Sequence, residues 1–269
     1  MSLLVAPRRR IWLYGLTALT LVFLVAPVLV VVPMSFSGSR FLEFPPKIWS
    51  LRWYDRFLTD ATWNGSLVLS LKLSVATAML ATPLGVAAAY ALHASTSPFF
   101  RRLQTVLLLP LMVPHIILAV GLFYMYAKLG WLGGFSSLLA ANVMMALPFI
   151  VVTTSAGLRD FDLNQELAAR AMGCSRFEAF RRVTLPQIAG SVVSGVVFAF
   201  ATALDEVVIA LFVSSGDNTT VTKVMFSSLR DEIDPTIAAV SALLIGTILS
   251  LVLLSRAIFW AFRAWSTPH

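Results

Sequence analysis

The chain has 269 residues, of which 58% are hydrophobic and 12% are charged, with a formal net charge of +7 and a mean hydropathy of +0.85. A soluble globular domain carries about 25% charged residues, so this composition excludes one, and the length allows about six membrane spans of roughly 20 residues each. The positive charge is typical of a membrane protein that retains Lys and Arg at its cytoplasmic face, so we expect contact with membrane lipid and no nucleic-acid partner.

The N-terminal region has the pattern of a first span that is not cleaved. Arg8, Arg9 and Arg10 precede an uncharged stretch that runs from residue 11 to residue 39. A signal peptide has an apolar core of about 7–15 residues and then a small-residue cleavage site. The stretch here is longer, and Pro27 stands where a cleavage motif would be needed.

Further uncharged or nearly uncharged runs predict the remaining spans. Backbone groups in lipid must be hydrogen-bonded within the protein, so runs of this length predict helices, and the alternating segments of about ten residues that mark a barrel are absent. We therefore expect an all-α polytopic membrane protein with a single transmembrane domain over residues 1–269. The expected spans are about 11–33, 67–91, 105–126, 132–156, 188–211 and 237–258.

The loop charges orient these spans. Six spans place both termini on one side, and Lys and Arg are enriched in cytoplasmic loops. The side with the termini carries twelve Lys or Arg residues against seven on the other, so we expect both termini in the cytoplasm. The twelve are Arg8, Arg9, Arg10, Arg101, Arg102, Arg159, Arg170, Arg176, Arg181, Arg182, Arg256 and Arg263, and the seven are Arg40, Lys47, Arg52, Arg56, Lys128, Lys223 and Arg230.

The loop at residues 159–186, between the fourth and fifth expected spans, is the least lipid-like part of the chain. Asn164 is a suitable N-cap for a first short helix, and Gly173 suits the C-terminal end of that helix. Ser175 and Glu178 have the spacing of a capping box at the start of a second short helix. We expect two short helices that meet at the glycine on the cytoplasmic side.

One side of the first short helix is small and apolar, because Leu167, Ala168, Ala171 and Met172 share it at helical spacing. Such a surface fits a groove in another protein or lies on lipid head groups, and composition alone leaves both interpretations open.

The spacing of this loop resembles the EAA motif of ATP-binding-cassette importer permeases. In that motif Glu-Ala-Ala is followed by three residues, Gly, nine residues and Ile-x-Leu-Pro. Leu167 occupies the Glu position of the motif, and Glu166 precedes it; Val183 stands at the Ile position. The residues that match are Ala168, Ala169, Gly173, Leu185 and Pro186.

The resemblance implies a type I importer permease fold whose coupling helix fits a cleft on a separate ATPase. The coupling residues would be Glu166, Leu167, Ala168, Ala169, Met172, Gly173, Leu185 and Pro186. It also implies partners: two ATP-binding subunits, a second permease subunit of a different sequence and an extracellular substrate-binding protein. The chain has no Gly-x4-Gly-Lys-Ser/Thr loop, so we expect no enzyme activity and no cofactor on it, with ATP and Mg bound by the ATPase.

Two carboxylates, Asp205 and Glu206, lie inside the expected fifth span, where an acidic side chain costs about 2.5–3.5 kcal/mol. We expect the pair to line the substrate path, with one member facing it because neighbouring helical side chains point about 100° apart. The alternative is a structural pairing with Lys72 of the second span or with the second permease. Cys174 is interpreted as a packing residue and His115 as a packing or hydrogen-bonding residue, so no catalytic or metal-binding residue is predicted.

The region at residues 198–239 resembles the C-type permease subunit of bacterial spermidine/putrescine importers, where an acidic pair follows a run of small residues. The resemblance implies a polyamine or a similar small cation, which a path lined with carboxylates would attract. Opines, amino-acid-like compounds and phosphonates stay open as substrates because related subfamilies carry them. A polytopic membrane enzyme would need a polar catalytic cluster, and the motif around Gly173 argues against an ion-coupled secondary transporter.

Overall fold

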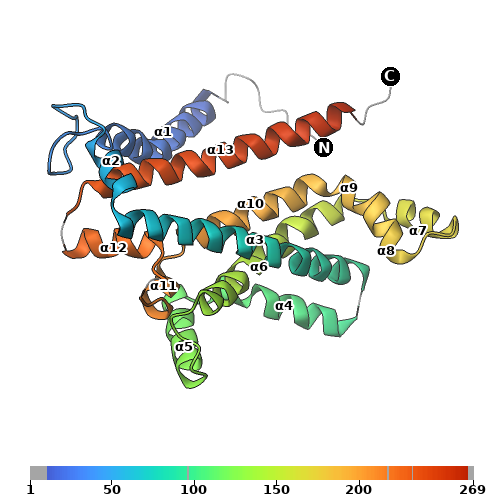
Figure 1. The fold of residues 1–269 in the computed structure, drawn as a ribbon. Helices are drawn as coiled ribbons and strands as arrows, with labels where there is room; N and C mark the ends of the chain where they lie inside the picture. Colours follow the sequence, from blue (N-terminus) through green and yellow to red (C-terminus); the bar gives the residue numbers. More distant parts are fainter. Residues whose placement is uncertain (1–10, 96, 217, 232, 266–269) are drawn as a thin grey trace. The chain divides into compact units, whose positions relative to one another are not determined.

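The computed structural model describes residues 11–95, 97–216, 218–231 and 233–265; the arginines at positions 8–10 lie outside them. Within those ranges every regular element is a helix, and extended pairing is limited to isolated bridges between Ser37 and Trp49 and between Gly133 and Ser214. The expected all-α class is confirmed (Figure 1). The described residues divide into two units, one within Met1–Ala61 and Ser227–Thr247 and the other within Thr62–Phe226 and Ile248–His269.

Over the described part of the chain, four helices are long and apolar enough to cross a membrane, and two bent helix pairs raise the number to six. The four are α1 (Ile11–Met34), α3 (Ala61–Ala94), α6 (Phe135–Arg159) and α13 (Thr236–Trp265). The bent pairs are α4 (Pro98–Met112) with α5 (His115–Lys128), and Arg176–Gln187 with α10 (Ala189–Asp205). The six spans expected from the sequence equal the upper number, which is reached if each bent pair is one span, and the two bends were not expected.

The first unit contains α1 and the short helix α2 (Arg52–Thr59). Helix α1 has no charged residue and exposes large apolar side chains, among them Leu19, Phe23 and Leu24. A helix that is apolar on all sides belongs in lipid or against another apolar helix.

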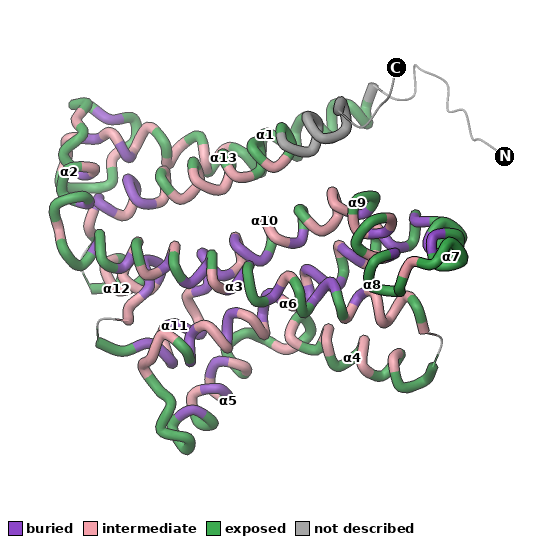
Figure 2. Tube along the Cα trace, turned by 45° about the vertical axis from the view of Figure 1, so that its right-hand side comes forward, coloured by how far each residue is buried: buried purple, intermediate pink, exposed green. Residues whose placement is uncertain are grey.

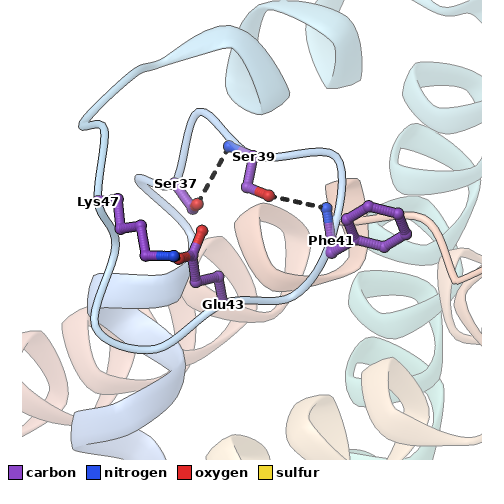
Figure 3. A network of polar contacts seen from close by, with 5 residues as sticks. All are labelled: Ser37, Ser39, Phe41, Glu43 and Lys47. Carbon is purple, nitrogen blue, oxygen red and sulfur yellow. Dashed lines mark hydrogen bonds and ion pairs between the residues drawn. The ribbon is translucent and has the colours of Figure 1, made fainter.

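The loop that follows α1 is held by polar contacts of its own (Figure 3). The backbone amides of Ser39 and Phe41 donate to the hydroxyl oxygens of Ser37 and Ser39 at 3.2 and 3.1 Å. Lys47 pairs with Glu43 at 3.2 Å. Serine side chains thereby provide hydrogen-bond acceptors for backbone amides that lie outside any helix or strand.

The core of the second unit lies along α3, α6 and α10, where Figure 2 shows many of the buried residues. Helix α10 packs along α6 and buries the small residues Gly195, Ala199 and Ala203. Small residues let helices approach closely in a membrane, where lipid provides no hydrophobic drive between helices.

The expected span at 105–126 is not one helix, and we correct it to two. Helix α4 ends at Met112 and α5 begins at His115, with a bend of 103° between them. Val113 is extended, with φ −89° and ψ 133°. Proline disfavours the helical conformation of the residue before it and has no amide to continue the helix, so Pro114 accounts for the break.

The expected span at 188–211 also differs, because α10 ends at Asp205. Glu206 is extended, with φ −71° and ψ 108°, and a new helix, α11 (Val208–Val213), follows it. The Glu206 carboxylate accepts the backbone amide of Ile209 at 2.9 Å. An acidic side chain that bonds a free helix amide stabilises a helix start, so this residue favours a break over a continuous span. Helix α12 (Val221–Asp231) comes next.

The turn between α5 and α6 is attached to the end of α11. The Gly133 amide donates to the Val213 carbonyl at 3.0 Å, and the Asn218 side-chain amide donates to the Gly133 carbonyl at 3.0 Å. Gly133 has φ +77°, and a Cβ atom there would collide with the hydroxyl of Ser215. Glycine alone meets both requirements without strain.

Gly133→Ala should lower the thermal unfolding midpoint of the purified permease by more than Gly130→Ala does. Gly130 also has a positive φ, +64°, but a Cβ atom there meets nothing within 4 Å. Both variants lose about 1–2 kcal/mol to the left-handed backbone, and only Gly133→Ala adds the collision with Ser215. Equal midpoints for the two variants in detergent would show that the collision with Ser215 contributes nothing.

Candidate functional site

Residues 159–186, here called the motif loop, form a succession of short helices. They are α7 (Leu163–Ala171), α8 (Arg176–Ala179), a π-helical turn at Phe180–Thr184, and α9 (Leu185–Gln187). The expected N-cap Asn164 is wrong: the cap is Asp162, whose carboxylate accepts the Asn164 amide at 3.0 Å. The helix begins one residue before Asn164, and Asp is as good a cap as Asn. The capping box of Ser175 and Glu178 is confirmed.

Gly173 ends α7 in a Schellman motif. Its amide donates to the Arg170 carbonyl at 3.0 Å, and the amide of Cys174 donates to the Ala169 carbonyl at 3.2 Å. These two bonds are the pair that defines the motif, and the residue at this position takes a left-handed backbone. Gly173 has φ +99°. The glycine therefore sets the angle at which the chain leaves α7 for α8.

The outward side of α7 is apolar, and none of the residues that the structure describes covers it. The side chains of Leu167, Ala168, Ala171 and Met172 are all exposed, with Met172 at 81% and Leu167 at 55%. Figure 2 shows α7 largely exposed. Apolar side chains grouped on a polar surface are typical of a protein contact site. The face expected from the sequence is therefore present at the end of α7.

Glu166 points the opposite way and is 4% exposed. One carboxyl oxygen accepts the hydroxyl of Tyr90 at 2.5 Å, and the other accepts the hydroxyl of Thr184 at 2.6 Å. Ala169, one turn later, is also buried. Glu166 thus connects α7 to α3 and to the π-helical turn, and its side chain is not part of the outward face.

Sequence reasoning missed Tyr90 and Thr184 as partners of Glu166, because they lie 76 and 18 residues away along the chain. Arg176 also reaches Tyr90: its Nε donates to the Tyr90 hydroxyl at 3.3 Å, and its guanidinium carbon lies 5.3 Å from the ring centre. Next to this group is a cavity of about 660 Å³. Its lining includes Pro83, Val86, Tyr90, Arg176, Phe177 and Phe180.

The last two motif residues stand where the loop joins α10. Leu185 is partly buried and Pro186 is exposed. The Leu185 amide donates to the Phe180 carbonyl, five residues back, which makes the turn π-helical. Proline has no amide for the helical ladder, and π-turns often occur at functional sites. The helical path bends by 79° between Gln187 and Ala189.

The acidic pair lies at the end of α10, and its two members differ in exposure. Asp205 is exposed, whereas Glu206 is 6% exposed. The carboxylate of Glu206 is occupied by the Ile209 amide, and its second oxygen lies 3.6 Å from Nδ1 of His115. Only Asp205 therefore presents its carboxylate outside the fold of this chain.

The anticipated partner of the acidic pair, Lys72, is exposed and forms no ion pair among the residues the structure describes. The partner that the structure gives to Glu206 is His115, which was expected to be a packing or hydrogen-bonding residue without a named partner. The sequence held one indication that His115 lies at a special position: it directly follows Pro114, at the break between α4 and α5. Nothing in the sequence showed that the two helix breaks meet.

Polar contacts from the start of α12 hold the segment around the acidic pair. The hydroxyl of Thr222 donates to the backbone carbonyl of Glu206 at 3.0 Å, and the amide of Val221 donates to the hydroxyl of Ser70 at 2.9 Å. The Lys223 ammonium donates to the carbonyl and hydroxyl oxygens of Ser214 at 2.8 and 2.9 Å. Burial lowers the pKa of Lys223. Across the described ranges, no three His, Cys, Asp or Glu side chains lie close enough together to hold a metal ion.

Comparison with known proteins gives a consistent set of relatives. Residues 81–262 match the family described as binding-protein-dependent transport system inner membrane component. The putrescine permease PotI of Escherichia coli K12 is 32% identical over 247 residues, which cover 88% of this chain and 86% of that protein. The spermidine/putrescine permease PotC of Haemophilus influenzae is 31% identical over 236 residues, covering 88% and 91%. The molybdenum permease ModB of Mycobacterium bovis is 29% identical over 222 residues, covering 78% and 82%.

Solved structures share the fold. A bacterial ABC transporter that imports the acidic polysaccharide alginate superposes with a TM-score of 0.72 at 14% identity, covering 93% of this chain and 97% of that one. The inward-facing methionine transporter MetNI gives a TM-score of 0.61 at 16% identity, covering 76% and 99%. At these identities the likeness establishes the arrangement of helices alone.

Glu166→Ala should destabilise the chain by about 2 kcal/mol, because it leaves the hydroxyls of Tyr90 and Thr184 without their acceptor. Leu167→Ala is the matched control: the neighbouring side chain is 55% exposed, and its removal should change stability by less than about 0.5 kcal/mol. Thermal unfolding of the two detergent-purified variants measures the difference. Glu166→Ala with the midpoint of the wild type would contradict the buried connection.

Proposed function

Because the chain belongs to the family of binding-protein-dependent transport system inner membrane components, we propose that the substrate it transports is a polyamine or a similar small cation. The chain is a multi-pass inner-membrane permease subunit of an ATP-binding-cassette importer. Its role is transport, and the substrate, the docking surfaces and the orientation of the termini are the parts that require experiment.

The substrate proposal is carried by the named relatives. The permeases that are 31–32% identical over 88% of this chain are named for putrescine and for spermidine with putrescine. The exposed carboxylate of Asp205 supports it, because a negative side chain at a helix break inside the membrane attracts an ammonium group. Discontinuous spans frequently form the substrate sites of other membrane transporters.

An oxyanion is the second candidate substrate. ModB, which is 29% identical over 78% of this chain, is named for molybdenum transport. An exposed carboxylate repels an anion, so the position of Asp205 favours the cation. The two candidates differ in sign of charge, which makes them easy to separate by competition for uptake.

The proposal also includes the proteins with which this permease assembles. Two ATP-binding subunits hold ATP and Mg, and one of them receives the outward face of α7 at Leu167, Ala168 and Met172. A second permease subunit completes the path, and a periplasmic protein delivers the substrate. A structural neighbour, the alginate ABC transporter, was solved in complex with a substrate-bound periplasmic protein. Both termini and the motif loop lie in the cytoplasm.

Transport in this proposal alternates between two arrangements of the helices. ATP draws the ATPase subunits together, and a docked motif loop transfers the movement to the spans it connects. Glu166 supports such a transfer, because its carboxyl group joins α7 to Tyr90 of α3 and to Thr184 before α10. A change at the ATPase thereby biases which side of the membrane the path opens to.

Gly173→Pro should uncouple ATP hydrolysis from uptake while leaving membrane insertion intact. Proline fixes φ near −65° and has no amide, whereas Gly173 has φ +99° and donates to Arg170. We expect uptake by proteoliposomes that contain the complete importer to fall at least about 10-fold, a loss of roughly 1.4 kcal/mol in coupling. ATPase activity measured on the same vesicles reports the residual hydrolysis.

The control for this experiment is Gly173→Asn, since Asn tolerates the left-handed region and keeps the amide. It should retain most of the coupled uptake. Normal transport by Gly173→Pro would refute the coupling role of the loop.

Asp205→Asn should raise the apparent KM for putrescine on the order of 10-fold, because a hydrogen bond to a charged group contributes about 1.5–3 kcal/mol. Asp205→Glu keeps the charge and is the matched control. Uptake of radiolabelled putrescine by the reconstituted importer, with spermidine and molybdate as competitors, gives the measurement. Uptake of labelled molybdate without uptake of putrescine would replace the polyamine with the oxyanion.

A further inference from the structure

Two of the helix breaks, those at Pro114 and at Glu206, come together at one carboxylate. Helix α5 begins at His115, immediately after the break at Pro114, and α11 begins at Val208, two residues after Glu206. One oxygen of Glu206 accepts the Ile209 amide at 2.9 Å, and the other lies 3.6 Å from Nδ1 of His115. A single side chain therefore contacts the first turn of α11 and the first residue of α5.

The Glu206 side chain is 4% exposed, whereas that of its partner His115 is 48% exposed. A carboxylate this deeply buried in a membrane protein requires compensation. The Ile209 amide provides a hydrogen bond, the starts of two helices provide a favourable dipole, and the imidazole can pair with it when protonated. These contacts account for the acidic residue without any substrate.

Helices α5 and α11 also pack against each other along their length. Ala119, Leu122 and Tyr126 of α5 belong to the same buried cluster as Ile209 and Val213 of α11. Their distant ends are connected where the Gly133 amide donates to Val213. The two helices therefore pack together, and we call them the α5–α11 pair. The same buried cluster includes Leu73 of α3 and Leu138 and Met145 of α6, so the pair also rests on those helices, and the chain joins it to α4 and to α10 through the breaks at Pro114 and Glu206.

We propose that Glu206 is a positioning residue that fixes the α5–α11 pair at its two breaks, while Asp205 alone presents its carboxylate to the transported substrate. The assignment divides the work of two adjacent acids: one holds the helices and the other contacts the cargo. The role of Asp205 rests on the proposed cation substrate. The role of Glu206 rests on the contacts with His115 and Ile209 and does not depend on the substrate.

The division gives the two residues different kinetic effects. Loss of Asp205 weakens the substrate contact and raises KM. Loss of Glu206 leaves the substrate contact in place but releases the α5–α11 pair, so it lowers the maximal rate of uptake with KM within about 2-fold. Glu206→Gln retains an oxygen for the Ile209 amide and a polar group for His115, so it should recover at least half of the rate lost in Glu206→Ala.

The experiment is a double-mutant cycle on the complete importer in proteoliposomes, with wild type, His115→Ala, Glu206→Ala and the double variant. Putrescine uptake gives KM and maximal rate, and basal ATP hydrolysis is measured on the same vesicles. Residues that act as a pair give non-additive effects. We expect the double variant to be no slower than Glu206→Ala, where independent residues would multiply their losses.

Two results overturn the proposal. Multiplicative losses in the double variant would show that His115 and Glu206 act independently. A rise in KM on Glu206→Ala or Glu206→Gln equal to that of Asp205→Asn would make Glu206 a substrate contact. If size exclusion shows that Glu206→Ala does not assemble, Glu206→Gln and His115→Ala provide the test. Lowered maximal rates at unchanged KM in these variants support the contact between His115 and Glu206. Wild-type rates in both variants refute it.

The cycle separates this inference from the proposed function. A wild-type importer that transports no polyamine refutes the cation substrate and the role of Asp205. The measurements of basal ATP hydrolysis still test the role of Glu206, because they need no assumption about the transported substrate. Non-additive hydrolysis rates support the pair in that case, and additive rates refute it.

Discussion

Every backbone amide and carbonyl released by a helix break in a membrane must find a partner inside the protein, because lipid supplies none. This constraint shapes the second unit. The chain interrupts two of its spans, and in each case side chains and neighbouring segments complete the bonding. At Pro114 the missing amide leaves one donor fewer to satisfy. At Glu206 the side chain accepts the Ile209 amide, and Thr222 donates to the Glu206 carbonyl. A substrate path with polar groups is stable in a membrane only where such hydrogen-bond partners exist.

The motif loop meets a different requirement, since it exposes apolar side chains and still keeps a defined shape. The inward side of α7 provides the shape: Glu166 and Ala169 are buried while Leu167 and Met172 stand outside. Gly173 closes the helix with two backbone hydrogen bonds that do not depend on side chains. The expected coupling residues therefore fall into two groups, those that hold the loop and those that are exposed on its outer side. A sequence motif records both groups without distinguishing them.

Sequence reasoning reached the all-α class, the capping box at Ser175 and the role of Gly173 as a helix terminus, because each depends on neighbours a few residues away. It missed the contacts of Glu166 with Tyr90 and of Glu206 with His115, which are long-range and leave no periodic pattern. It also extended two spans through breaks, because hydropathy averages over a window and does not register a single Pro114. The burial of Glu206 beside the exposed Asp205 depends on how α10 ends, which composition does not encode.

The contacts of Glu166 have a mechanical consequence. The carboxyl group ties three segments that are distant in sequence, namely α3, α7 and the turn before α10, at one point. A load applied to α7 is divided at that point between two spans instead of bending the loop. In the proposed docking, a displacement of α7 by a partner would pass through this carboxyl group to α3 and to the turn before α10. A small movement of α7 would then move α3 and the turn before α10 together with it, and the motif loop itself would deform little.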